Sequence, residues 1–150
     1  MGARSARANV AFLAIVAAVL VVVGCLSTWA TVLGVSFTGT DANAGKSTLV
    51  SAVVAAVLVL VGTASGRRWL SVVAAIPAAI AAAISSYRLA DIANFVQGAN
   101  NAEASWGIWL TTISAIALLV LCIVHAAVPV AERAADEVAP PEETPPPPTV

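Results

Sequence analysis

Four long apolar blocks separated by short polar segments dominate the hydrophobic pattern of the chain. A bilayer core about 30 Å thick needs roughly 20 apolar residues in a helix to cross it. Each block is close to that length, and none has Asp, Glu, Lys or Arg in its interior. A charge there would cost roughly 2.5–3.5 kcal/mol on insertion scales. The pattern predicts four membrane-spanning helices, at about 10–33, 47–65, 69–87 and 106–128.

Aromatic residues fall at or near the ends of these blocks. Amphipathic rings prefer the headgroup level of a bilayer, so they indicate where each span leaves the hydrocarbon. All four Trp residues and the only Tyr fit this pattern. The expected interface anchors are Trp29, Trp69, Tyr87, Trp106 and Trp109.

The basic residues predict the orientation of the spans. Cytoplasmic segments carry an excess of Lys and Arg. If residues 1–9 lie inside, the cytoplasmic segments contain Arg4, Arg7, Arg67, Arg68 and Arg133, and the outer segments contain only Lys46 and Arg88. We therefore expect an all-α, antiparallel four-helix transmembrane bundle over residues 10–128. It would lie in the plasma membrane with both termini in the cytoplasm.

The two outer segments have different patterns. Residues 34–46 begin with alternating apolar and hydroxyl residues and continue with turn formers. Residues 88–105 place Leu89, Ile92, Phe95 and Val96 at helical spacing. This spacing favours a short amphipathic helix on the outer surface, and the alternative is that the third span continues into water.

The segment 129–150 is acidic and rich in proline, with four consecutive prolines at 145–148. Such a composition cannot bury enough apolar surface to order itself, so we expect a disordered cytoplasmic tail. A docking role for the proline run is the alternative.

Overall composition agrees with the membrane interpretation. The chain is 60% hydrophobic and only 10% charged, whereas soluble domains are about 45–50% apolar and about 25% charged. The net charge of −1 gives no basic patch of the kind that nucleic-acid binding requires.

Small residues predict how the third span packs. Helices in lipid associate where small side chains let their backbones approach closely. One face of this span carries only small residues, which we expect to meet a similar face of the second span. These helix-packing residues are Ser71, Ala74, Ala78, Ala82 and Ser85.

The fourth span has a polar seam formed by Thr111, Ser114, Cys122 and His125, which lie within one sector of the helix. The seam is a candidate ligand site or proton path. The alternative is that the hydroxyls bond to their own helix and His125 lies near the cytoplasmic interface. No span contains an acidic partner for the histidine.

Cys25 follows an apolar run and two arginines, as in a bacterial lipoprotein signal with its lipobox. If the chain were cleaved there, Cys25 would become a lipid anchor and the first span would be lost. Against this, the apolar block continues to Leu33 and three further spans follow. Cys25 and Cys122 are expected at different depths, so no disulfide between them is predicted, and no spacing suggests a metal site.

Gly45-Lys46-Ser47-Thr48 looks like the end of a phosphate-binding loop, but the loop requires an earlier glycine where Thr40 stands. We expect no nucleotide, no cofactor and no catalytic residues. The acids that could assist a nucleophile lie on the opposite side from His125.

Three short motifs resemble those of small four-span membrane proteins of unknown function that are common in actinobacteria. They are Trp29 at the end of the first span, Gly39-Thr40-Asp41 with Gly45-Lys46, and Gly107-Ile108-Trp109. The resemblance covers about residues 10–128 and implies a four-helix membrane fold, but no activity.

We therefore expect a non-enzymatic accessory or scaffold component that acts on a membrane-protein partner or on further copies of itself. The first alternative is a subunit of an oligomeric small-molecule transporter or channel. The second is a lipoprotein anchored at Cys25.

Overall fold

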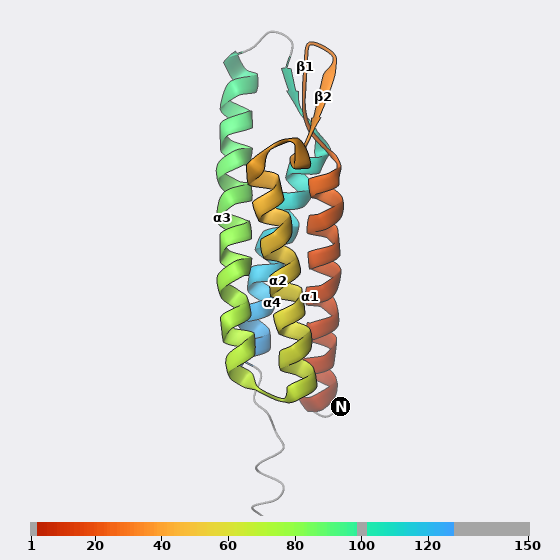
Figure 1. Cartoon of the computed structure of the whole chain (residues 1–150), viewed down its shortest axis with the longest axis vertical. Coiled ribbons are helices and arrows are strands. Elements are labelled where there is room, and N and C mark those ends of the chain that lie inside the picture. Colours follow the sequence, from red (N-terminus) through yellow and green to blue (C-terminus); the bar gives the residue numbers. More distant parts are fainter. Residues whose placement is uncertain (1–2, 99–101, 128–150) are drawn as a thin grey trace, which may run out of the picture.

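The structure, a computed structural model, describes residues 3–98 and 102–127. Four long helices form an elongated bundle, with a small sheet at one end (Figure 1). Each helix contains a stretch long and apolar enough to cross a membrane, which confirms the four apolar helices expected from the sequence and indicates a multi-pass membrane protein. They are α1 (Ala3–Leu26), α2 (Asn43–Ser65), α3 (Arg68–Gly98) and α4 (Trp106–Ala127).

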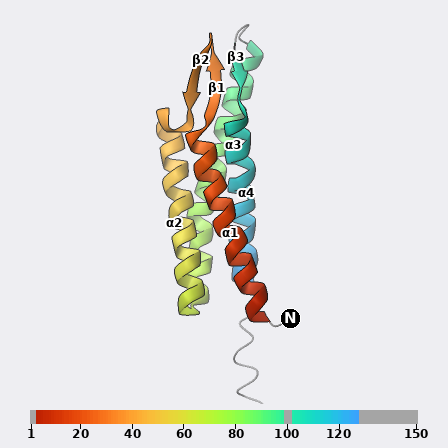
Figure 2. The same cartoon turned by 90° about the vertical axis from the view of Figure 1, so that its right-hand side faces the viewer.

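Neighbouring helices pack with unequal closeness. The contacts between α1 and α4 are the most extensive, followed by those of α3 with α2 and with α4. The contacts between α1 and α2 are sparser, and α1 leans away from α2 toward the end of the bundle with the N-terminus (Figure 2). The short turn at Gly66 joins α2 to α3 at that end, and the sheet lies at the other end (Figure 1).

The bundle is packed with small residues inside and large apolar residues outside. Ten alanines of α1, α2 and α3 are at most 6% exposed, while Phe12, Ile76 and Ile113 are each more than 60% exposed. A soluble domain would reverse this arrangement, because water penalises exposed large apolar side chains. Hydrocarbon does not, so the distribution fits a protein whose helices are surrounded by lipid.

A three-stranded antiparallel sheet covers the end of the bundle opposite Gly66. It consists of β1 (Thr28–Val32), β2 (Val35–Thr38) and β3 (Ala102–Ala104), in the order β2-β1-β3. Val32 pairs with Val35, so only Leu33 and Gly34 form the hairpin loop. Both have positive φ, +52° and +81°, as a type I′ turn requires. We call this sheet and the following 3-10 helix η1 (Gly39–Asp41) the outer head.

The outer head corrects the all-α prediction. We expected the first span to continue to Leu33, but α1 ends at Leu26 and β1 begins at Thr28. Thr28–Val32 is a short run with three β-branched residues, and it pairs with β2 on one side and β3 on the other. Hydrogen bonds to two neighbouring strands outweigh the continued apolar character of the segment.

The second outer segment also differs from its prediction. Instead of a separate surface helix, α3 runs without interruption from Arg68 to Gly98. Its 31 residues would span about 46 Å, which exceeds a hydrocarbon core of about 30 Å. Beyond Tyr87, Leu89 and Ile92 pack against the core cluster, so this part of α3 supports the outer head. The predicted tail, 129–150, lies outside the described residues.

Glycines allow the outer head to lie directly on the bundle. A β-carbon on Gly39 would overlap the ring of Trp29 and the Cys25 carbonyl, and one on Gly45 would overlap the Gly39 backbone. A β-carbon on Gly107 would overlap the Thr28 carbonyl. Gly45, which the phosphate-loop interpretation used, therefore serves as a point of close backbone contact.

We predict that Gly45→Ala destabilises the protein by roughly 1–3 kcal/mol, the usual effect of overpacking. The substitution lies in α2, so helix propensity alone would favour alanine by up to about 1 kcal/mol. The Gly39 backbone cannot move aside as a flexible side chain would. We therefore expect the clash to outweigh the gain in helix propensity, so that the free energy of unfolding falls. Unfolding of the purified protein in detergent micelles measures the change.

Gly98→Ala is the matched control, because a β-carbon at Gly98 meets no atom within 4 Å. If Gly45→Ala were as stable as the wild type, or more stable, the close contact between Gly39 and Gly45 would be refuted.

Candidate functional site

The polar seam of α4 lies inside the bundle. Thr111, Ser114, Cys122 and His125 are all buried. The Thr111 hydroxyl donates to the carbonyl of Gly107 at 2.8 Å, which is the bond to its own helix that the sequence left as an alternative. The adjacent Thr112 donates to Ile108 at 2.9 Å and lies 3.3 Å from the Ser85 carbonyl of α3. Most of the seam is thus part of the packed interior.

His125 is different, because it contacts polar side chains from the three other helices. Its Nδ1 lies 2.9 Å from Ser71 Oγ of α3. Its Nε2 lies 3.1 Å from Thr63 Oγ1 of α2 and 3.4 Å from Arg7 Nε of α1. We call Arg7, Thr63, Ser71 and His125 the inner cluster, which joins one residue from each helix near the Gly66 end of the bundle.

The hydrogen bonds of the inner cluster indicate the state of His125. Arg7 can only donate, so Nε2 must offer its lone pair to make that contact. The imidazole is then neutral, with its proton on Nδ1 donated to Ser71. The Thr63 hydroxyl has one proton, which it donates either to the Val59 carbonyl at 2.7 Å or to His125 Nε2 at 3.1 Å. One guanidinium nitrogen, Arg7 Nη2, is enclosed and has no hydrogen-bond partner among the described residues.

The predicted packing residues of α3 all lie in the core. Ser71, Ala74, Ala78 and Ser85 are fully buried and Ala82 is 6% exposed. Across from them, Gly62 of α2 lies against Leu70 and Ser71, where a β-carbon would be 3.2 Å from Leu70 Cβ and 3.3 Å from Ser71 Oγ, closer than ordinary van der Waals contact. Ala52, Ala55 and Val59 complete the buried face of α2.

The expected interface anchors fall into two groups. Trp69, Tyr87, Trp106 and Trp109 are each at least 50% exposed, whereas Trp29 is 4% exposed. Trp29 is the extra residue of a β-bulge, since Thr28 pairs with Thr38 and Ala30 with Phe37. The bulge directs the ring inward, and its Nε1 donates to the Gly24 carbonyl at 3.0 Å. Trp29 therefore packs between the outer head and the helices, and it does not serve as the predicted anchor at the lipid headgroups.

Cys25 and Cys122 are both buried and free of disulfide bonds. Cys25 lies near the head end of α1, next to the crossing of Gly24 with Thr111 of α4. Among the residues that the structure describes, no three His, Cys, Asp or Glu side chains come close enough to hold a metal ion.

Asp41 stabilises the turn between the outer head and α2. Its Oδ2 accepts from the Thr38 backbone N–H at 2.7 Å and from the Thr38 hydroxyl at 2.8 Å. These two hydrogen bonds, with a smaller contribution from the Lys46 charge, hold the pKa of the Asp41 carboxyl below its ordinary value of 3.8. The motif Gly39-Thr40-Asp41 is therefore a structural turn.

Sequence reasoning missed the inner cluster because it looked for an acidic partner of His125. The actual charged partner, Arg7, is a cation from the far end of the chain. The signal available was that Arg7 lies three residues before the predicted start of the first span and His125 three residues before the predicted end of the fourth, at the same end of the bundle. Comparison with known proteins finds no matching family model, curated protein or solved structure.

We predict a coupling of about 0.6–1.7 kcal/mol between Ser71 and His125, the range measured for hydrogen bonds between helices in membranes. A double-mutant cycle with Ser71→Ala and His125→Leu, followed by unfolding in mixed micelles, measures it. The control cycle pairs Ser114→Ala with His125→Leu, whose side chains are about 16 Å apart along α4. Equal coupling in both cycles would contradict the inner cluster.

A second prediction concerns the pH dependence of the outer head. Because the folded-state pKa of Asp41 is lowered, its stabilising effect is complete above pH 3.8 and is lost as the pH falls through the lower folded value. Hydrogen exchange at the Thr38 amide should therefore accelerate in wild type relative to Asp41→Asn as the medium becomes that acidic. A constant ratio of the two rates between neutral and strongly acidic pH would show that Asp41 does not hold the turn.

Proposed function

We propose that this protein is a non-enzymatic accessory or scaffold subunit of a plasma-membrane complex, and that the outer head binds its partner outside the cell. In this proposal the helices form an antiparallel bundle with both termini in the cytoplasm. The proposal rests mainly on one observation: the sheet ends in an exposed strand that combines an open backbone edge with apolar side chains.

The distribution of charge supports the proposed orientation. Arg7 and Arg67 lie at the Gly66 end, and Arg4, Arg68 and Arg133 belong to the same side by sequence. At the head end, the described residues include Lys46 and Arg88 together with all of their acids, Asp41, Asp91 and Glu103. The positive-inside rule then places the Gly66 end in the cytoplasm.

In the order β2-β1-β3, β2 is one of the two edge strands, and among the described strands it pairs with β1 alone. In a hairpin with a two-residue loop, the residues flanking the loop exchange both hydrogen bonds, and the next pair exchanges none. Val32 and Val35 flank the loop, and Thr31 and Ser36 form the next pair. The N–H and C=O of Ser36 should therefore point away from β1, toward the free edge.

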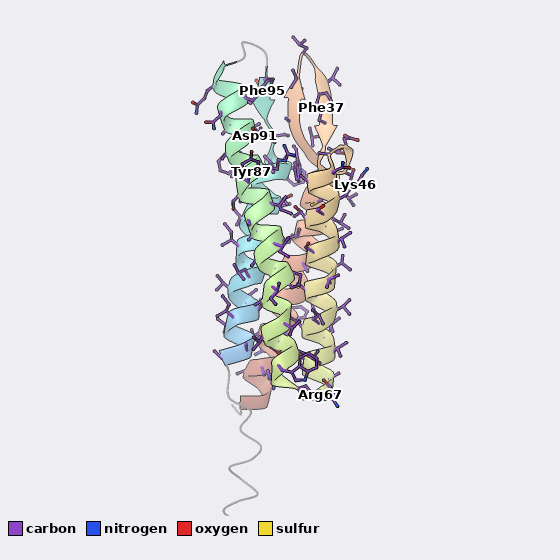
Figure 3. The ribbon with its side chains drawn as sticks, turned by 60° about the vertical axis from the view of Figure 1, so that its left-hand side comes forward. Phe37, Lys46, Arg67, Tyr87, Asp91 and Phe95 are labelled. Atoms are coloured by element: carbon purple, nitrogen blue, oxygen red, sulfur yellow. The ribbon has the colours of Figure 1, made fainter. Side chains whose placement is uncertain are left out.

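The side chains of this edge are apolar and exposed. Ala30 pairs with Phe37 and Val32 with Val35, so these four residues share one face of the sheet. Phe37 is 46% exposed, Val35 57% and the loop residue Leu33 76%. Phe37 lies beyond the level of Tyr87 and Lys46, at the same end of the molecule as Phe95 (Figure 3).

An extended segment of a partner suits this surface. Such a segment adds to a sheet by main-chain hydrogen bonds to the open edge, while alternate side chains provide specificity. Lipid would satisfy the apolar side chains but not the open backbone groups of Ser36, which supports a protein partner over simple membrane contact.

The alternatives have less support. A transporter or channel subunit needs a polar path, whereas Thr111 of the seam and the adjacent Thr112 bond to carbonyls within the protomer. A lipoprotein cleaved before Cys25 would lose α1, and with it the most extensive helix contacts of the bundle.

We predict that photo-crosslinking amino acids at Val35 and Phe37 capture one discrete polypeptide in native membranes. The same probe at Trp69, which is 56% exposed near the opposite end, is the control. No adduct above the Trp69 background, or adducts with lipid alone, would refute the proposal.

Two substitutions at one position test the backbone edge. Ser36→Pro removes the outward N–H and leaves the hydrogen bonds to β1 in place, so the adduct at Phe37 should disappear. Ser36→Val keeps the N–H and should preserve the adduct. Equal capture by both variants would mean that the edge of β2 does not bind the partner.

A further inference from the structure

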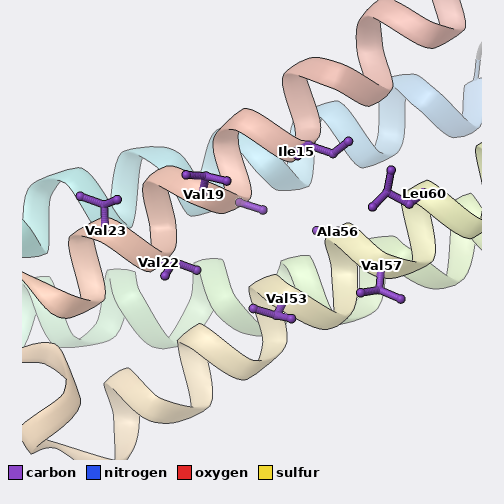
Figure 4. A pocket seen from close by; sticks show the side chains of 9 residues that line it. Ile15, Val19, Val22, Val23, Val53, Ala56, Val57 and Leu60 are labelled. Atoms are coloured by element: carbon purple, nitrogen blue, oxygen red, sulfur yellow. The ribbon is translucent and has the colours of Figure 1, made fainter.

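A lateral groove runs between α1 and α2 within the membrane-spanning part of the bundle. It has a volume of about 230 Å³, and every residue that lines it is apolar. Ala18 and Ala56 create the hollow by their small size, and Val19, Val23, Val57 and Leu60 stand around it (Figure 4). It lies where α1 leaves α2 to lean on α4 (Figure 2).

A groove of this chemistry holds hydrocarbon more readily than water. Apolar cavities of about 150 Å³ stay dry and take up molecules such as benzene. This groove is larger and its walls belong to membrane-spanning helices, so acyl chains surround it. A partner helix fits it poorly, because helix association needs small or polar residues at the contact, whereas valine and leucine form the rim.

The faces that form the groove continue to the inner cluster. On α1, Arg7 precedes Ala18 by 11 residues, about three turns and roughly 16 Å, so both lie on nearly the same face. On α2, Thr63 follows Ala56 by seven residues, about two turns and roughly 10 Å. One leaflet of a core of about 30 Å is about 15 Å deep, so an acyl chain in the groove would place its headgroup near Arg7.

Arg7 offers the interaction that such a headgroup needs. Its Nη2 is enclosed with no acceptor within residues 3–98 and 102–127, and an unpaired buried cationic donor is costly enough to indicate a missing partner. A phosphate oxygen provides both the acceptor and the opposite charge, and guanidinium groups bind phosphate through paired hydrogen bonds. Among the described residues no acid lies at this end of the bundle to take that place.

We propose that the α1–α2 groove binds one phospholipid with an anionic headgroup, whose acyl chain fills the groove and whose phosphate accepts a hydrogen bond from Arg7. The site does not involve the outer head, so it is independent of the partner proposed above.

The test uses the full-length protein in nanodiscs that contain an anionic and a zwitterionic phospholipid with the same photoreactive acyl chains. Native mass spectrometry should find one retained lipid of the anionic kind. After illumination, adducts of the anionic lipid should be enriched over those of the zwitterionic lipid at Val19 and Val57, but not at Ile113, an exposed residue of α4 that contacts bulk lipid. Because hydrogen bonds to charged groups are strong, Arg7→Gln should weaken retention about tenfold or more.

Arg67→Gln is the matched control, since Arg67 is an exposed arginine at the same end of the bundle and should leave retention unchanged. Ala56→Leu should fill the groove and abolish the adducts, while Ile113→Leu should not. If Ala56→Leu fails to fold, the adduct map of the wild type and the retention of lipid by the two arginine variants still test whether the groove binds the anionic phospholipid.

Three outcomes would overturn the proposal. Equal retention of both lipids with no effect of Arg7→Gln would show that only bulk solvation occurs. Adducts from Val19 and Val57 to another polypeptide would make the groove a helix-docking surface. Loss of the retained lipid on adding inorganic phosphate would show a site for a free anion, whereas a lipid site should resist it.

Discussion

Helices surrounded by hydrocarbon gain almost nothing by hiding apolar side chains from one another, because lipid tails are equally apolar. They hold together only where their backbones come close enough for dense van der Waals contact and a few hydrogen bonds. The core of this bundle meets that constraint with alanine, glycine and serine. Gly24 lies against Thr111, and Gly62 against Ser71, so helix-to-helix distance is set by the absence of side-chain volume.

Because apolar burial contributes so little in lipid, the few polar side chains inside the bundle contribute a larger share of its stability and specificity. Among the residues that the structure describes, His125 lies within hydrogen-bonding distance of a polar side chain from each of the three other helices: Arg7, Thr63 and Ser71. Shape packing by small residues is tolerant of sliding, while directional bonds are not. The inner cluster therefore fixes the register of helices whose alanine faces would fit in more than one alignment.

The short glycine and tryptophan motifs of the sequence all lie at the contact between the outer head and the bundle. Trp29, Gly39, Gly45 and Gly107 come from different segments, yet all lie where the outer head rests on the bundle. Asp41 closes the turn beside them. The short motifs that resemble other four-span proteins thus describe how a head is attached to helices, which is a matter of architecture.

Sequence reasoning was strong where a property is summed over many residues and weak where one contact decides. Four apolar helices and the small face of α3 follow from composition and spacing alone. The hairpin did not, since Leu33-Gly34 is not a usual type I′ pair and hydropathy continues through β1. β3 is only Ala102–Ala104, too short to show a strand pattern. The contact of Arg7 with His125 joins residues 118 positions apart, which no local pattern reveals.

The connections between sheet and helices carry a mechanical consequence. One residue, Ser27, separates α1 from β1, and one residue, Ser105, separates β3 from α4. The Ser105 N–H is in turn hydrogen-bonded to the Trp29 carbonyl at 2.9 Å. Because each linker is a single residue, the sheet cannot rotate independently of α1 and α4. Any molecule bound to the sheet would be held at a fixed height and angle above the lipid surface.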